Sequence, residues 1–268
     1  MRAVREEGEM DLPFLITAWH DSIERTRALG LDDANGAAET SLPGWRVRDV
    51  LAHLVHFEEC LAFGGGEQAA PSGPGITPDF TQLGVDALAE VPVAQLSDRL
   101  EAAAGTSLGR LTPPPTDPEA GIGRALAGHE WAWGPLLRNR AIDAWMHEQD
   151  IRRAIDRPGG LDSAGARISV AMFADALPYI VGKLAAAPQA HPVRFEIVGP
   201  APFIGTIAVG PDGRAATSPA EPLTTITMGT EAFTRLCGGR EPRSCFDIAI
   251  TGDAEVADRI LAQLAVTP

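Results

Sequence analysis

The sequence predicts an α+β protein in which an N-terminal bundle of helices is followed by a small α/β domain. Segments with apolar residues every three to four positions fill most of residues 12–187, and from residue 193 the apolar period becomes strand-like. With 268 residues, 45% of them hydrophobic, the chain is long enough for two cores. The predicted domains are 1–189 and 190–268.

Five helices are predicted in the N-terminal part. They occupy 12–29, a segment from 47 onward, 93–111, a segment from 138 onward, and 163–187. The fourth runs until Pro158, Gly159 and Gly160 stop it, and Pro178 predicts a kink in the fifth. Residues 64–78 are rich in Gly, Pro, Ser and Ala and are expected to form a long loop, either a lid or a disordered connection.

The C-terminal domain shows strands separated by turn residues. Strands are predicted at 193–198, 203–209, 223–228 and 245–250, and short helices at 231–237 and 254–264. Gly199-Pro200 and Pro211-Asp212-Gly213 mark the first two turns. These segments predict a small α/β unit.

The charge composition of the chain restricts the kinds of partner that it is expected to bind. Lys and Arg total 22 against 36 Asp and Glu, a formal charge of -14. An acidic chain without a basic cluster is not expected to bind nucleic acid or an anionic membrane. No apolar run approaches the roughly 20 residues that span a bilayer, and residues 1–11 are acidic, so a cytoplasmic location is expected. The three cysteines show no CxxC pairing and are expected to be reduced.

The helix from 138 onward carries a polar stripe among apolar residues. At about 100° per residue, Asp143, His147 and Asp150 share one narrow arc. Residues four apart on a helix have Cβ atoms roughly 5–6 Å apart, so Asp143 and His147 can converge on one cation. The same stripe fits a solvated face, or a core histidine held by a carboxylate. A metal site needs a third ligand from elsewhere.

Histidines of the second helix offer that ligand. His53 lies at the margin of the apolar face beside Phe57, whereas His56 points nearly opposite the centre of that face. The position of His53 also fits a structural histidine bonded to a backbone carbonyl. Cys60, two turns below His53, is interpreted as a small buried side chain.

Two stretches together resemble a known family. They are GWRVRDVLAHL at 44–54 and DAWMHEQDIRRA at 143–154. The combination is similar to the mycothiol-dependent maleylpyruvate isomerase family of the DinB-like metalloprotein superfamily. The resemblance implies a DinB-like four-helix-type bundle followed by a small α/β domain related to sterol carrier proteins.

The resemblance also implies a metal site. In that family a divalent metal, usually zinc, is bound by a His of the second helix and by a carboxylate and a His four residues apart on a later helix. The matching positions are His53, Asp143 and His147. The isomerase has Glu where this chain has Asp143, so the carboxylate here reaches less far. Two nitrogens and one oxygen suit zinc and also admit nickel, iron or manganese.

Neighbouring carboxylates have separate roles to consider. Asp150 lies on the arc of His147 and could orient its imidazole, or could be solvated near arginines. Glu148 follows His147 as in an HExxH metalloprotease, but that pattern requires His where Ile151 stands. Glu148 is therefore expected to face solvent or Arg152.

The functional hypothesis is a zinc-dependent transferase or isomerase. Three protein ligands leave a fourth position open, and a low-molecular-weight thiol held there as a thiolate could add to a small electrophilic substrate. By resemblance the thiol is mycothiol. Two alternatives stay open: a protein that binds a small apolar ligand without turnover, and metal-assisted chemistry without a thiol. The sequence assigns neither the substrate, nor the catalytic residues beyond the metal ligands, nor the oligomeric state.

Overall fold

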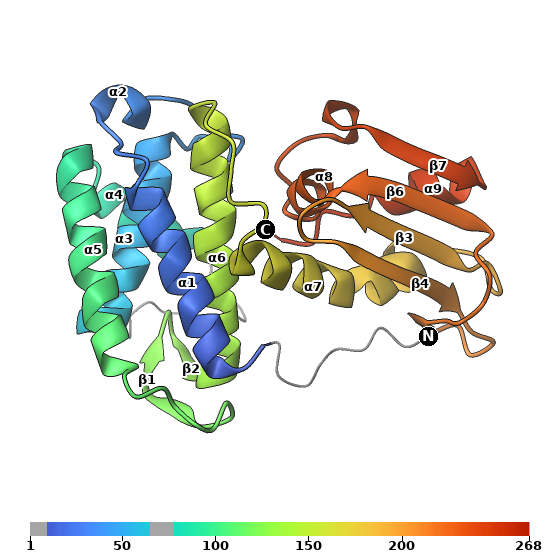
Figure 1. The fold of residues 1–268 in the computed structure, drawn as a ribbon, viewed down its shortest axis with the longest axis horizontal. Coiled ribbons are helices and arrows are strands. Elements are labelled where there is room, and N and C mark those ends of the chain that lie inside the picture. The colour runs from blue at the N-terminus through green and yellow to red at the C-terminus, as the bar shows by residue number, and fades with distance from the viewer. Residues whose placement is uncertain (1–9, 65–77, 268) are drawn as a thin grey trace. The chain divides into compact units, whose positions relative to one another are not determined.

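The computed structural model describes residues 10–64 and 78–267, which fall into two compact units (Figure 1). The predicted long loop lies outside the described residues except for Gly64 and Pro78. The units are Met10–Gly160 and, after it, Leu161–Pro268. The division therefore falls at residue 160, not at the expected 189, because helix α7 (Ala164–Tyr179) packs against a strand and a helix of the second unit.

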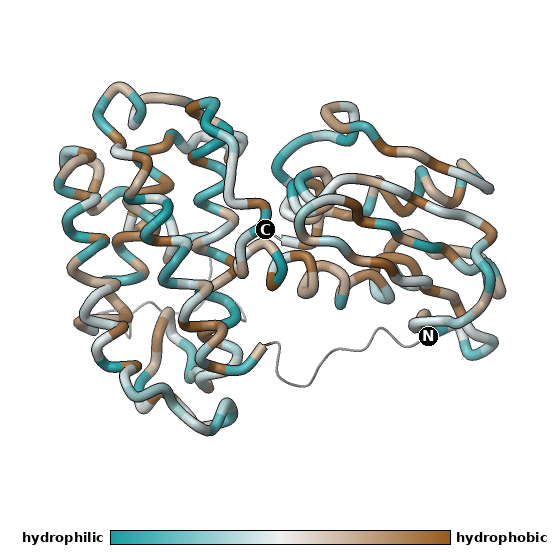
Figure 2. Tube along the Cα trace, in the orientation of Figure 1, coloured by the Kyte–Doolittle hydropathy of each residue, from teal (hydrophilic) through white to brown (hydrophobic). Residues whose placement is uncertain are grey.

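Four long helices build the N-terminal unit. They are α1 (Leu12–Arg27), α3 (Val47–Phe63), α5 (Val93–Arg110) and α6 (Trp133–Ala154). Both α1 and α3 pack against α5 and α6, which closes the bundle. Hydrophobic and hydrophilic positions alternate around these helices, as Figure 2 shows. Burial of the apolar side of each helix is therefore the main force that holds the bundle together.

Helix starts in the bundle follow from local capping. Asp11 accepts a hydrogen bond from the backbone N–H of Phe14 at 2.9 Å, and Pro13 occupies the first turn of α1. At the start of α3, Asp49 accepts from the N–H of Arg46 at 2.8 Å. These caps begin the helices at the residues that the sequence predicts, and they fix the register that brings His53 into the bundle.

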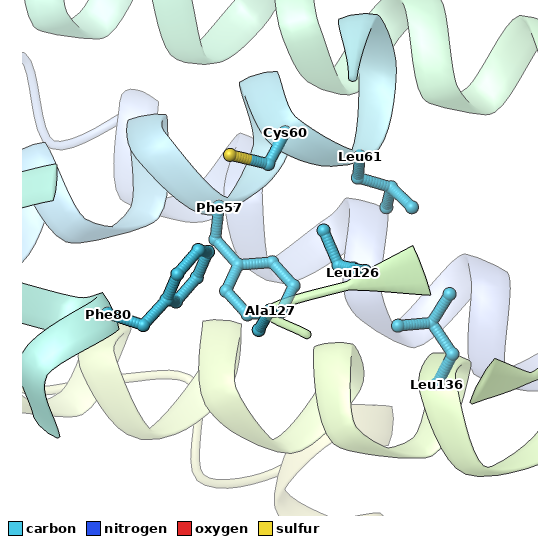
Figure 3. Packing of buried hydrophobic residues seen from close by; sticks show 7 residues of the cluster. All are labelled: Phe57, Cys60, Leu61, Phe80, Leu126, Ala127 and Leu136. Carbon is cyan, nitrogen blue, oxygen red and sulfur yellow. The ribbon is translucent and has the colours of Figure 1, made fainter. Parts of the chain in front are cut away.

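Smaller elements complete the N-terminal unit. They are the short helices α2 (Asp33–Gly36) and α4 (Pro78–Ala87) and the hairpin strands β1 (Gly121–Leu126) and β2 (His129–Ala132). Figure 3 shows how α3, α4, the hairpin and α6 share one apolar cluster. Its buried members are Phe57, Cys60, Leu61, Phe80, Leu126, Ala127 and Leu136. Cys60 is thus a small buried side chain, as expected.

A mixed five-stranded sheet forms the centre of the C-terminal unit. The strands are β3 (Val193–Val198), β4 (Phe203–Val209), β5 (Ala215–Thr217), β6 (Thr224–Gly229) and β7 (Ile248–Gly252), in the order β5-β4-β3-β6-β7. Strands β3 and β6 are parallel and the other pairs are antiparallel. Phe195 pairs with Ile226, and both are fully buried beneath the helices.

Helices pack against that sheet. Helix α8 (Thr230–Cys237) contacts β3 and β6, α9 (Ala254–Leu261) contacts β6 and β7, and α7 contacts β4 and β5. Helix α7 continues through a π-helical segment, so that Ala164–Leu184 is one helical run of 21 residues with Pro178 inside it. By length and composition alone this run could cross a membrane, contrary to the sequence expectation. A core helix of a globular protein can meet the same criteria of length and composition, and half of the most apolar window of Ala164–Leu184 is buried.

Candidate metal centre

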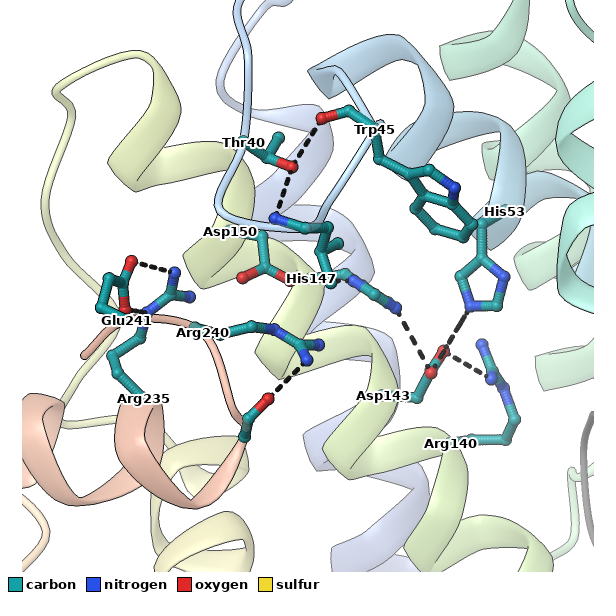
Figure 4. Close-up of polar contacts among 12 residues, drawn as sticks. Thr40, Trp45, His53, Arg140, Asp143, His147, Asp150, Arg235, Arg240 and Glu241 are labelled. Carbon is teal, nitrogen blue, oxygen red and sulfur yellow. Dashed lines mark hydrogen bonds and ion pairs between the residues drawn. The ribbon is translucent and has the colours of Figure 1, made fainter. Parts of the chain in front are cut away.

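Helices α3 and α6 bring His53, Asp143 and His147 together in the N-terminal bundle (Figure 4). Asp143 and His147 lie on successive turns of α6, and His53 faces them from α3. One potential ligand atom from each residue lies within 4.8 Å of the other two. The histidines are buried, and the Asp143 side chain remains 23% exposed. The group is therefore both preassembled and open at one side.

Separations among these donor atoms fit a shared ion better than hydrogen bonds. Nε2 of His53 and Nε2 of His147 each lie 3.5 Å from Oδ1 of Asp143. Good hydrogen bonds between such groups are about 2.7–3.2 Å long. Two atoms bound at about 2.0–2.2 Å to one tetrahedral ion are about 3.3–3.5 Å apart. The shorter Asp side chain thus reaches both histidines.

Asp150 and the ring of His147 are aligned for metal binding. Oδ2 of Asp150 lies 3.1 Å from Nδ1 of His147, and the Asp150 side chain is buried. A proton on Nδ1 leaves the Nε2 lone pair directed at the group, which is the usual arrangement for a ligating histidine. Nδ1 of His53, by contrast, is buried without a hydrogen-bond partner among the described residues.

Electrostatics also favour a cation among these donors. Burial lowers the pKa of His53, and the opposing attraction of Asp143 does not overcome it, so this imidazole is neutral and able to bind a metal. For His147 burial also lowers the pKa, but the carboxylates of Asp143 and Asp150 outweigh it and raise the pKa overall. Burial raises the pKa of Asp143, yet Arg140 and the histidines hold it well below its usual range. Asp143 is therefore an anion.

Arg140 and Glu58 are a buried pair that sequence reasoning missed. Oε1 of Glu58 accepts from Nε and Nη2 of Arg140 at 3.1 and 2.7 Å, and Nη1 of Arg140 donates to Oδ2 of Asp143 at 2.8 Å. A sequence signal was present, because Arg140 stands three residues before Asp143 and so lies on the same helix face. Nothing comparable in the sequence pointed to Glu58 on α3.

Trp45 forms an aromatic wall beside the histidines. Its ring centroid lies 5.5 Å from that of His53 and 6.4 Å from that of His147, with the second pair stacked. The indole Nε1 donates to Oε1 of Gln82 on α4 at 3.2 Å. The sequence signal for Trp45 was its place in the stretch 44–54, just before the helix that carries His53.

The remaining candidates lie away from the donor group. Glu148 is fully buried, and it accepts hydrogen bonds from Arg152, as expected, and also from Arg25 of α1. Solvent exposure of Glu148 was the wrong alternative, because α1 covers that side of α6. His56 is half-buried and packs on Phe80 of α4.

Comparison with known proteins identifies the family and the fold of the chain. Residues 16–152 match the family model of the mycothiol maleylpyruvate isomerase N-terminal domain. The chain belongs to this family. The region matched to the mycothiol maleylpyruvate isomerase N-terminal domain contains His53, Asp143 and His147. Among curated proteins no significant match was found.

Two solved structures share the fold of this mycothiol maleylpyruvate isomerase family member. One is mycothiol-dependent maleylpyruvate isomerase, with 13% identity and a TM-score of 0.53. The other is a variant of that isomerase with one histidine replaced by alanine, with 13% identity and a TM-score of 0.54. Each alignment covers 91% of this chain and 95% of the other. The shared fold therefore extends over both units.

Proposed function

We propose that the chain is a zinc-dependent thiol transferase or isomerase that uses a low-molecular-weight thiol, mycothiol by family, on a small electrophilic substrate. The observation that carries the proposal is the convergence of His53, Asp143 and His147, in which Oδ1 of Asp143 lies 3.5 Å from Nε2 of both histidines, a separation that two ligands of one tetrahedral ion have. Two imidazoles and one carboxylate are a typical ligand set of catalytic zinc.

Each residue of the donor group and its surroundings has a separate role in this proposal. His53, Asp143 and His147 would hold the metal, Asp150 would keep His147 in the required tautomer, and Trp45 would shield one side of the group from water. When bound, the metal supplies Lewis acidity, which lowers the pKa of a thiol and favours its nucleophilic form. As the sulfur forms a bond to an electrophilic carbon of the substrate, either a leaving group departs with its bonding electrons, or a conjugated C=C bond becomes single and its π electrons move to the conjugated carbonyl. If the C–S bond remains, the reaction is a transfer. If the carbon chain rotates about the former double bond and the thiolate then leaves as the double bond forms again, the reaction is an isomerisation.

Several finer features belong to this proposal and not to the family assignment. They are zinc as the metal, the use of mycothiol by this chain, a cytoplasmic location, and partners restricted to small molecules. The relation of the C-terminal unit to sterol carrier proteins also remains a prediction.

Activity measurements on zinc-loaded full-length protein test the proposal. Maleylpyruvate and the general electrophile 1-chloro-2,4-dinitrobenzene are each offered with and without mycothiol. We expect turnover only with mycothiol, lost in His53→Ala and retained in His56→Ala. The two histidines share α3, but only His53 belongs to the donor group, so His56→Ala is the matched control.

Other outcomes would favour the alternatives. Turnover in rigorously thiol-free buffer would indicate metal-assisted chemistry without a thiol. An absence of turnover, together with binding of a small apolar ligand that His53→Ala leaves intact, would favour the binding-protein hypothesis and contradict the proposal.

A further inference from the structure

A chain of buried polar contacts runs from Asp143 across the bundle. Arg140 contacts Oδ2 of Asp143, and Glu58 accepts two hydrogen bonds from Arg140, as described above. Trp19 of α1 donates its indole N–H to the same Oε1 of Glu58 at 2.8 Å. Three helices therefore contribute to a chain that ends on one oxygen of Asp143.

This chain leaves the Arg140 guanidinium little freedom. The group is fully buried, and its carbon lies 3.9 Å from the ring centroid of Phe57 on α3. An arginine side chain presents its donors in a rigid planar fork. With two donors committed to Glu58 and the face stacked on Phe57, the position of the Nη1 that holds Asp143 is determined by α3.

The two oxygens of Asp143 consequently differ in their partners. Oδ1 lies 3.5 Å from Nε2 of both His53 and His147. Oδ2 lies 3.4 Å from Nε2 of His53 but is already bonded to the Arg140 cation at 2.8 Å. A carboxylate that is not held in this way can bind a cation through both oxygens. Bidentate binding would occupy the position that a substrate needs.

Charge explains why Glu58 accompanies Arg140. A cation beside a metal ligand repels a divalent ion, and in a buried site that repulsion is weakly screened. Glu58 compensates the charge of Arg140, so the arginine can orient Asp143 without opposing the metal. A buried ion pair contributes little net stability to a fold. Its contacts with Asp143 give it a positioning role instead.

We propose that Glu58 and Arg140 are positioning residues that engage Oδ2 of Asp143 and so leave Oδ1 as the oxygen that would bind the metal. This inference rests on the proposed metal function. It assigns to the Glu58–Arg140 pair a role in coordination geometry that the three ligands alone do not supply.

Glu58→Gln is the sharpest test because the structure accommodates it. Oε1 of Glu58 receives all three donors, whereas Oε2 is buried without a partner among the described residues. An amide can therefore keep the acceptor, place its NH₂ at Oε2 and remove only the charge. The matched control is Glu59→Gln, which removes the negative charge that pairs with Arg99 at the next position of α3, outside the donor group.

Two measurements on full-length protein separate positioning from mere stability. Zinc affinity is obtained by competition with a chromophoric chelator, and coordination geometry from the visible spectrum of the cobalt(II) form, whose intensity falls as coordination number rises. Loss of a residue that orients a ligand typically lowers metal affinity about 10- to 100-fold. We expect that loss in Glu58→Gln, and a change of about twofold or less in Glu59→Gln.

Arg140→Met frees Oδ2 of Asp143 and is expected to weaken the cobalt absorption. Circular dichroism checks the helix content of each variant. If Arg140→Met does not fold, Glu58→Gln decides by zinc affinity, because it leaves the Arg140 cation uncompensated beside Asp143. Wild-type zinc affinity in folded Glu58→Gln, or an unaltered cobalt spectrum in folded Arg140→Met, would overturn the positioning role alone. A wild-type protein that binds neither zinc nor cobalt would contradict the underlying metal function.

Discussion

The carboxylate of Glu148 ties α1 to α6, and its replacement by an amide tests whether this residue is structural or catalytic. Nε of Arg25 lies 3.0 Å from each Glu148 oxygen, and Nε of Arg152 donates to Oε1 at 2.8 Å. Glu148 is fully buried, whereas the Arg25 and Arg152 side chains are 27% and 14% exposed. The glutamate therefore neutralises two arginines that lie closer to the surface.

The cost of Glu148→Gln follows from that geometry. Breaking a fully buried ion pair costs about 3–5 kcal/mol, because a charge is left uncompensated in the interior. Here both arginines retain access to water and the amide keeps one acceptor, so we expect a loss of about 1–3 kcal/mol. For a protein of this size that corresponds to a fall in Tm of roughly 3–10 °C.

Thermal unfolding followed by circular dichroism, with zinc content measured in parallel, checks this prediction. Glu101→Gln is the control, because it removes an ion pair with Arg27 in which Glu101 is 57% exposed, and should change stability by less than about 0.5 kcal/mol. Zinc content should be unchanged in both variants. Loss of zinc or of turnover in Glu148→Gln without loss of stability would refute the structural assignment.

Three further predictions address other features. Because the pKa of His147 is raised, its proton competes with the metal, so zinc affinity should increase as pH rises from 6 to 8; a flat profile in competition titrations would contradict this. In the metal-free protein the contribution of His147 to the free energy of unfolding has the opposite pH dependence. Protonated His147 stabilises the fold at low pH, and that contribution is lost as pH rises through the folded pKa. Gly252→Ala should destabilise the C-terminal unit by more than about 1 kcal/mol in denaturant titrations, because φ is +88° and a Cβ would lie 1.9 Å from the Leu223 carbonyl oxygen, whereas Gly229→Ala meets nothing within 4 Å. A thiol reagent should modify exposed Cys245 rapidly and Cys237 only on unfolding, because burial raises the pKa of Cys237; equal rates in the native protein would be inconsistent with its burial.

Regular apolar spacing made most of the fold predictable. The long helices and the strands β3, β4 and β6 occur where that spacing is unbroken, as in Val193, Phe195 and Ile197 of β3. Elements without such spacing were missed. The hairpin at Gly121–Leu126 and His129–Ala132 contains glycines and mixed burial, and β5 is only three residues long.

Tertiary packing explains the other differences. Helix α6 begins at Trp133 and not at 138, since the hairpin that leads into it supplies the turn and α6 packs against β2. The domain boundary depends on which unit α7 joins, and helix periodicity carries no information about that choice. Strand pairing across β3 and β6 is likewise a long-range property that a strand pattern cannot reveal.

The candidate site likewise contains residues that local sequence patterns predict and residues that only tertiary packing brings together. Helical periodicity alone placed Asp143, His147 and Asp150 on one face, and the resemblance to a family added His53 as their partner. The supporting residues were harder to find, because Glu58 and Trp19 approach Arg140 from other helices. Sequence reasoning predicted three residues that the fold brings together and missed the residues that contact them.

Metal content of purified protein tests the central claim most directly. Wild type, His53→Ala and His147→Ala are loaded with zinc, dialysed and analysed for zinc per chain, with His56→Ala as control and helix content checked by circular dichroism. The structure predicts about one zinc per chain in wild type and in His56→Ala, and loss of zinc in both folded site variants. Wild-type protein that retains no zinc, or zinc that stays bound in His53→Ala and His147→Ala, would contradict a metal centre at these residues.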